Sequence, residues 1–228
     1  MEINSSNIDL VVQEVVKAIK EKINNSKNKN TIPVEASGRH IHLSRQHVDL
    51  LFGKDYELKF ERELSQPGQY LCKEKVTLRG AKGKINNVAI LGPVRNNTQV
   101  EISKTDARIL GINAPVRESG DISNSSPIII VSDNVTLSLK EGAIIAKRHI
   151  HITPEDAERF NVMDRELVGL QILSDRSTIF GDVVVRVSKN FKTSAHIDYD
   201  EANSCSFMKN IEARIIKWER IVEDEKIN

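Results

Sequence analysis

Arg39-His40-Ile41-His42-Leu43-Ser44 is a stretch that the chain uses twice, because residues 148–153 read Arg-His-Ile-His-Ile-Thr. A helix-like segment follows each copy. Ser44 and Thr153 are residue types that cap helices, and Thr153 is followed by Pro and acidic residues, as in many first helical turns. Thr153 with Asp156 three residues on also resembles a capping box. We therefore predict a short strand followed by a short helix in both copies.

The two histidine pairs have the spacing of metal ligands on a strand. Side chains at i and i+2 share one face of a strand, so His40 points the same way as His42, and His149 the same way as His151. A single pair is more often a solvated surface feature. Two pairs with matching Arg, cap and helix favour metal binding. The pairs predict two metal sites, or one two-metal site if the two halves of the chain meet.

Length and composition limit the classes of function. The chain has 228 residues, which allows one or two domains, and a net charge of +1, which gives no basic surface for nucleic acid or an anionic membrane. We find no apolar run of about 20 residues for a membrane span, and we expect no signal peptide. Cys72 and Cys205 form no disulfide framework or CxxC motif, so a metal would be held by His and carboxylate.

The N-terminal segment predicts an amphipathic helix. In residues 8–23, apolar residues recur at helical spacing with charge on the other face, and residues 24–31 form a polar linker. A helix this short is marginally stable alone in water, so it must dock on something. Both the body of this protein and a partner protein are open as docking sites.

The rest of the chain reads as many short strands with few helices. This pattern is typical of barrels or sandwiches and argues against a parallel sheet. The tail after residue 208 is ambiguous between a helix and a strand at 213–217. Residues 103–111 predict a capped helix of one or two turns, and the strands are expected at 76–78, 85–91, 99–102, 128–131, 135–139, 143–146, 167–173 and 178–187, with one more around residue 196.

Two histidines lie outside the repeats. His196 begins a polar run directly after a β-rich stretch, and we interpret it as a fifth metal ligand. His47 lies in the helix after the first pair and is expected to be a surface residue. The acidic residues Asp198, Asp200 and Glu201, close to His196, are either part of a solvated turn or partners that orient imidazoles.

Residues 92–101 are the other conspicuous stretch. A Gly-Pro pair ends a strand, and Arg95 follows in the turn. Gln99 and Glu101 share a face, so Glu101 could complete a zinc site of two imidazoles and one carboxylate with an open position. Arg95 could bind an oxyanion such as phosphate through its planar guanidinium. A plain surface Arg and Glu is the alternative for this stretch alone.

Several ordered motifs together resemble the PduL-type phosphate acyltransferase family, which moves an acyl group between coenzyme A and inorganic phosphate. The motifs are residues 37–44, 64–69, 91–95, 98–103, 114–121, 148–151 and 196–203. The resemblance implies a mainly β fold of two small β-barrels capped by short helices. Barrel 1 would join residues 32–38 to 147–228, and barrel 2 would comprise residues 39–146.

The resemblance also implies the site residues. Two zinc ions would lie where the barrels meet, with Arg95 binding phosphate. The pairing of ligands to ions is open. The metal ligands would be His40, His42, Glu101, His149, His151 and His196, and the residues that touch coenzyme A would be Ser37, Arg62, Leu91, His196 and Asn203. Arg62 stands where a Lys is usual, and Ala89 stands where the family often has Arg.

The remaining implications concern location and partners. Residues 1–31 resemble a helix and linker that target an enzyme into a bacterial microcompartment, through contacts of residues 8–23 with shell or cargo proteins. The chain is expected to be a cytoplasmic homo-oligomer. Two alternatives use the same residues: a dinuclear zinc hydrolase that acts on a coenzyme A thioester, and a non-catalytic metal-stabilised microcompartment protein.

Overall fold

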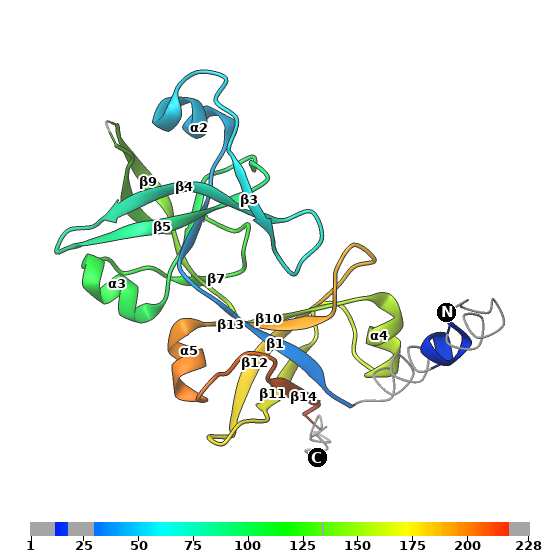
Figure 1. Cartoon of the computed structure of the whole chain (residues 1–228). Coiled ribbons are helices and arrows are strands. Elements are labelled where there is room, and N and C mark those ends of the chain that lie inside the picture. The colour runs from blue at the N-terminus through cyan, green and yellow to red at the C-terminus, as the bar shows by residue number, and fades with distance from the viewer. Residues whose placement is uncertain (1–11, 18–29, 134, 219–228) are drawn as a thin grey trace, which may run out of the picture.

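Two barrels stacked end to end form the body of the molecule in the computed structural model (Figure 1). The structure describes residues 12–17, 30–133 and 135–218. Residues 12–17 are helical, in agreement with the predicted N-terminal helix, and the rest of the predicted segment 8–23 lies outside the described residues. The predicted mainly β, two-barrel fold is confirmed.

Barrel 1 is a closed ring of six strands. Its strand order is β1-β13-β10-β12-β11-β14, and β14 pairs back onto β1. One strand thus comes from the N-terminal end and five from the C-terminal part of the chain. The bounds are β1 (Ile32–Ser37), β10 (His149–Ile152), β11 (Leu167–Ile172), β12 (Thr178–Val187), β13 (Ser194–Asp198) and β14 (Glu212–Ile216).

Barrel 2 is formed by the central part of the chain. Its strands follow the order β4-β5-β2-β6-β9, and β8 closes the ring by pairing with both β4 and β9. Strands β3 and β7 extend the sheet. The bounds are β2 (His40–His42), β3 (Phe60–Glu63), β4 (Tyr70–Arg79), β5 (Lys84–Gly92), β6 (Gln99–Glu101), β7 (Val116–Arg117), β8 (Ser126–Val131) and β9 (Thr136–Ala146). The domain boundaries at residues 38 and 146 stay a prediction.

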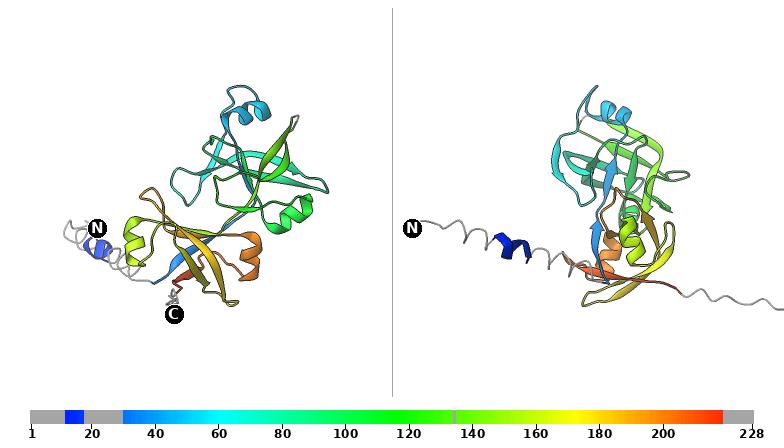
Figure 2. Two further views of the ribbon diagram at one scale, coloured as in Figure 1. Left: turned by 180° about the vertical axis from the view of Figure 1, so that it is seen from behind. Right: turned by 90° about the vertical axis from the view of Figure 1, so that its right-hand side faces the viewer.

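The chain crosses twice between the two barrels at their junction. β1 pairs within barrel 1 and runs on into β2 of barrel 2, while β9 pairs within barrel 2 and runs on into β10 of barrel 1 (Figures 1 and 2). The pairing is alike in both barrels: β2 is parallel to β5 and antiparallel to β6, and β10 is parallel to β12 and antiparallel to β13. Each histidine pair therefore lies on a strand at the junction.

Alternation along the histidine strands separates the core from the junction. Ile41 and Ile150 are fully buried, each in the apolar core of its own barrel. The histidines on either side of each isoleucine point the opposite way, because neighbouring side chains on a strand face opposite sides. Core packing of one isoleucine thus directs two imidazoles to the other face.

Short capped helices follow the histidine strands and also β6 and β13, the strands that pair antiparallel with them. Ser44 and Thr153 cap α2 (Arg45–Phe52) and α4 (Pro154–Arg159) as predicted, and their side chains accept from the backbone N–H of the residue three positions on. The capping box predicted at Thr153 is only half formed, since the Asp156 carboxylate binds Thr193 and Arg159. The equivalent helices of the two barrels are α3 (Lys104–Leu110) and α5 (Tyr199–Ser204).

Two other predictions were corrected or decided by the structure. The two strands predicted at 135–139 and 143–146 are, from residue 136 on, the single strand β9, which passes through Gly142 at φ +153°. Only glycine adopts this backbone conformation readily, so the chain stays in one strand. The ambiguous tail is strand β14, because pairing with β1 and β11 outweighs its helical spacing.

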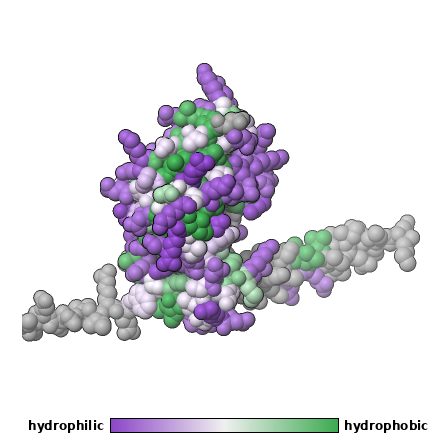
Figure 3. All heavy atoms as spheres, turned by 90° about the vertical axis from the view of Figure 1, so that its left-hand side faces the viewer, coloured by the Kyte–Doolittle hydropathy of each residue, from purple (hydrophilic) through white to green (hydrophobic). Residues whose placement is uncertain are grey.

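The surface is mainly polar. The face that carries α3 and α5 is mostly hydrophilic, with scattered hydrophobic patches (Figure 3). In the helical residues 12–17, Val12, Val15 and Val16 are 53%, 51% and 41% exposed. Among the described helices, none is long and apolar enough to cross a membrane.

Candidate active site

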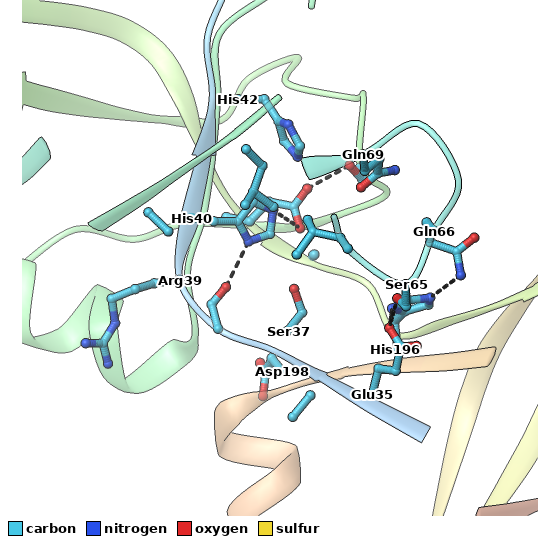
Figure 4. A pocket seen from close by; sticks show the side chains of 18 of the residues that line it. Glu35, Ser37, Arg39, His40, His42, Ser65, Gln66, Gln69, His196 and Asp198 are labelled. Atoms are coloured by element: carbon cyan, nitrogen blue, oxygen red, sulfur yellow. Dashed lines mark hydrogen bonds and ion pairs between the residues drawn. The ribbon is translucent and has the colours of Figure 1, made fainter. Parts of the chain in front are cut away.

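A cavity of about 530 Å³ lies where the two barrels meet. Both histidine pairs open onto it, together with Glu101, His196 and Arg95. Figure 4 shows His40 and His42 on the strand from barrel 2 and His196 on the strand from barrel 1, while Arg39 points away from them. Residues far apart in the sequence therefore share one space.

The first cluster consists of His40, His42 and Glu101. Antiparallel pairing of β2 with β6 sets His40 opposite Glu101, and His40 Nε2 lies 3.5 Å from Glu101 Oε2. The other ring nitrogen, His40 Nδ1, is 2.8 Å from the Gly38 carbonyl. That contact favours the tautomer in which Nδ1 donates, which leaves the Nε2 lone pair for a metal.

The second cluster consists of His149, His151 and His196. The pairing of β10 with β13 sets His149 opposite His196, as His40 lies opposite Glu101, so His196 and Glu101 occupy equivalent places. The ring centroids are 4.6 to 5.0 Å apart. His149 Nδ1 is 2.9 Å from the Lys147 carbonyl, in the same arrangement as His40 and Gly38.

Both clusters suit a metal ion. Within each cluster the donor atoms lie within 4.8 Å of one another. His42 Nδ1 and His151 Nδ1 are buried without a hydrogen-bond partner. A buried polar atom without a partner is costly, and a bound cation in the cluster would compensate that cost. The first cluster offers two imidazoles and a carboxylate, and the second offers three imidazoles. Both donor sets fit zinc and leave one coordination position open.

The protonation states in the site also fit cation binding. Burial, aided by His40 and Arg95, lowers the pKa of His42 to about 3, and burial together with His149 lowers the pKa of His151 to about 3. Burial alone would raise the pKa of Glu101, but His40, His42 and a hydrogen bond from Ser119 lower it to about 2. At neutral pH these histidines are neutral and the carboxylate is ionised, as metal ligands must be.

We expect the metal-free protein to lose stability as the pH falls from 6.5 to 5. His42 and His151 stay neutral in the folded chain in this range, whereas their unfolded pKa is 6.5, so the unfolded chain binds more protons. The free energy of unfolding should fall by up to about 1.4 kcal/mol per pH unit for each histidine. The stabilisation that comes from Glu101 is lost only below about pH 4.5, because its pKa is lower in the folded chain than in the unfolded chain.

Urea unfolding of protein freed of metal with a chelator, at pH 7, 6 and 5, measures this dependence. A variant with His42→Gln and His151→Gln is the matched control and should show a shallower slope. A stability that rises toward pH 5 in the wild-type chain would contradict the buried neutral histidines.

Arg95 stands beside the first cluster. Its backbone N–H donates to the Leu43 carbonyl at 2.9 Å, which ties the turn after β5 to the end of β2. Its Nη1 donates to Ser119 Oγ at 3.3 Å, and Ser119 Oγ in turn donates to Glu101 Oε1 at 2.7 Å. Gln99 Nε2 donates to both Ser119 and Glu101. A guanidinium is thus held at a fixed place next to a candidate metal ligand.

Comparison with known proteins decides the family. The family model described as phosphate propanoyltransferase matches residues 33–208. The chain belongs to the phosphate propanoyltransferase family. It is 58% identical over 186 residues to a phosphate propanoyltransferase of Listeria monocytogenes, with 82% of this chain and 87% of the relative covered.

More distant relatives carry the same name. A phosphate propanoyltransferase of Clostridioides difficile is 53% identical over 207 residues, covering 91% of this chain and 96% of the relative. One from Thermotoga maritima is 52% identical over 174 residues, covering 76% and 83%. The predicted resemblance to the phosphate acyltransferase family is confirmed.

The residues that the family resemblance assigns to coenzyme A lie around two neighbouring cavities. Ser37, Arg62 and Leu91 line the cavity that holds the clusters. Asn203 does not; it lines a second cavity of about 430 Å³. Ala36 and Tyr199 line both cavities, which are therefore neighbours. The contacts of these residues with coenzyme A stay predictions.

The wall around Ala89 keeps a cation even though the family often has Arg there. Lys75 on β4 is the pairing partner of Ala89 on β5, and its side chain lines the same cavity. Exposed Arg62 lies on this cavity as well.

Other polar residues near the motifs have structural partners. Asp198 and Glu201 form the capping box of α5, and no hydrogen bond or ion pair in the described part of the chain joins them to an imidazole. Glu201 also pairs with Arg148, just as Asp106 in the capping box of α3 pairs with Arg39. The arginine before each histidine pair therefore anchors a helix, and Arg39 also lines the edge of the cavity.

His47 belongs to neither cluster. It is half-buried, and its Nδ1 lies 2.7 Å from Thr98 Oγ1. His47 is therefore a partly exposed residue whose ring is held by the turn before β6.

Sequence reasoning missed three residues at the site. Glu35 Oε2 lies 3.7 Å from His196 Nδ1, and Gln66 reaches from barrel 2 to place its Nε2 3.4 Å from His196 Nε2 (Figure 4). Arg186 lines the cavity from β12. None of them stands in a repeated pattern. Only the pairing of β1 with β13 and β10 with β12 brings Glu35 and Arg186 to the histidines.

Proposed function

We propose that the protein transfers a short acyl group between coenzyme A and inorganic phosphate at a site that binds two zinc ions. The observation that carries the proposal is the single cavity onto which two metal-type clusters and Arg95 open. Membership of the phosphate propanoyltransferase family supports the reaction. In the forward direction the thioester C–S bond breaks, a C–O bond to phosphate forms, and coenzyme A leaves as the thiolate.

Each cluster would hold one zinc ion. Three protein donors per ion leave a position open for a substrate atom. When bound, zinc supplies Lewis-acid stabilisation of negative charge on the reacting groups. One ion would be held by His40, His42 and Glu101, and the other by His149, His151 and His196.

Arg95 would bind phosphate. Its guanidinium offers several N–H donors in a planar arrangement that matches two oxygens of one anion. Ser119 holds Arg95 on one side and Glu101 on the other. Phosphate would therefore be fixed relative to the first cluster, and such positioning of two reactants lowers the barrier to their reaction.

Coenzyme A would lie along the two neighbouring cavities. Ser37 and Leu91 line the wall near the clusters, and Asn203 lines the second cavity. Arg62 and Lys75 supply positive charge for the phosphate groups of coenzyme A. His196 faces the same space as Ser37 and would contact coenzyme A close to its sulfur end.

Dependence of coenzyme A release on phosphate tests the proposal. With the zinc-loaded protein and propionyl-CoA or acetyl-CoA, we expect release of free thiol only when phosphate is present, with an equal amount of acyl phosphate formed. Release without phosphate would assign a thioester hydrolase. A zinc-loaded sample that releases no thiol with either substrate would favour a non-catalytic metal protein.

The location and assembly of the protein are part of the same proposal. We propose that residues 8–23 bind shell or cargo proteins of a cytoplasmic microcompartment and that the chain is a homo-oligomer. The exposed valines of helical residues 12–17 support the first point. Co-sedimentation of the full chain with assembled shells, compared with a chain that starts at residue 32, tests the docking, and mass photometry tests the oligomer.

A further inference from the structure

Arg186 approaches the cavity from the barrel opposite to Arg95. It lies on β12 of barrel 1, paired in register with His151 on β10, and its side chain lines the cavity of the two clusters. Arg95 lies in the turn after β5 of barrel 2 and lines the same cavity. Both β5 and β12 are the parallel neighbours of a histidine strand, so each barrel directs one arginine to the junction.

The guanidinium of Arg186 forms no ion pair with a carboxylate of the described residues. Over residues 12–17, 30–133 and 135–218 it forms no hydrogen bond or ion pair; its one ring contact is with Phe191, whose centroid lies 5.9 Å from the guanidinium carbon. Phe191 in turn packs on the ring of His151 at 4.1 Å. The side chain is half-buried. A half-buried arginine with free N–H donors facing a cavity is suited to an oxyanion ligand.

The acidic groups near Arg186 already have partners. Glu118 is bound by both terminal nitrogens of Arg165. Glu101 accepts from Ser119 and Gln99 and faces His40. Neither carboxylate forms an ion pair with Arg186 or Arg95 in the described part of the chain.

The two arginines are near enough to repel each other. Burial lowers the pKa of Arg95, Glu101 opposes this, and the positive charge of Arg186 lowers it further. Repulsion between two cations that share one cavity is relieved when a dianion lies between them. Two guanidiniums from opposite sides can bind different oxygens of the same tetrahedral anion, so together they hold it more tightly than either does alone.

We propose that Arg186 is the second guanidinium of the phosphate subsite and binds the same oxyanion as Arg95. This inference rests on the proposed function and extends it: Arg186 would contact inorganic phosphate in one direction of the reaction and the phosphoryl group of the acyl phosphate in the other. Its stacking on Phe191 would hold the guanidinium toward the cavity.

Steady-state kinetics of the zinc-loaded full chain tests the role. For Arg186→Gln, which keeps the side-chain stem over Phe191, and for Arg186→Ala, we expect the KM for phosphate to rise about 10- to 100-fold. The KM for propionyl-CoA should stay within about twofold of wild type, and Arg186→Lys should recover part of the loss. The matched control is Lys189→Ala, an exposed cation just beyond the end of the same strand.

Direct binding separates this inference from the proposed function. Calorimetric titration of zinc-loaded protein with inorganic phosphate alone should show weaker binding for Arg186→Gln by a similar factor. If wild type shows no phosphate-dependent thiol release but its phosphate binding depends on Arg186, the inference holds and the proposed function fails. If wild type is active and Arg186→Gln keeps its KM and affinity for phosphate, the inference fails alone. A rise only in the KM for propionyl-CoA would also overturn it.

Discussion

Arg95→Ala is expected to lose phosphate-dependent release of coenzyme A by a factor of roughly 10² to 10³ in kcat/KM, with zinc content unchanged. Among the described residues the Arg95 guanidinium hydrogen-bonds only to Ser119, so its removal takes away donors that face the cavity. Ser119 keeps its hydrogen bond to Glu101, and no metal ligand loses a protein partner. The loss should therefore fall on the anion and not on the metal.

Phosphate dependence, zinc content and thermal stability of the same sample measure this effect. Arg95→Lys keeps the charge without the planar fork and should recover only part of the activity. Arg108→Ala is the control, because Arg108 is an exposed arginine on α3 that does not line the cavity. Wild-type turnover in Arg95→Ala would remove Arg95 from the proposed site.

Removal of metal is expected to abolish activity, and added Zn²⁺ is expected to restore it. One imidazole in each cluster, His42 or His151, has a lowered pKa and a buried Nδ1 without a hydrogen-bond partner, and Glu101 is ionised. A bound cation would satisfy these groups. We expect about two equivalents of zinc per chain. Glu101→Gln and His196→Ala should each lose about one equivalent, because equivalent positions of the two barrels hold these residues.

Elemental analysis together with activity checks this prediction. His47→Ala is the matched control: His47 is a half-buried histidine in the same barrel as the first cluster, but it binds Thr98 and does not line the cavity. It should keep both metal equivalents and the activity. Full turnover in a preparation free of divalent metal would contradict the two-metal site.

The repeated motif made part of the fold predictable. The spacing of His40 and His42 fixes their common face, and the caps at Ser44 and Thr153 follow from local hydrogen bonding. Short strands are visible as apolar runs. The prediction divided β9 into two strands because a glycine such as Gly142 usually ends an apolar run. In the structure, pairing with β6 and β8 keeps the strand continuous across Gly142.

The candidate site was less accessible to sequence reasoning. His196 and Glu101 could be suggested by chemistry, but their equivalence depends on strand register across two barrels. Arg186 follows three valines in β12 and reads as an ordinary outward-facing residue of a strand. Long-range pairing decides such positions, and no local pattern records it.

The two crossings of the chain between the barrels also set the order in which the barrels can fold during synthesis. Strand β1 leaves the ribosome before the other described strands, yet its partners are β13 and β14, the last two to be made. His40, His42 and Glu101 are all present once barrel 2 has been translated. His149, His151 and His196 can come together only after residue 196 has been made. The pairing of β1 with β14 then closes barrel 1.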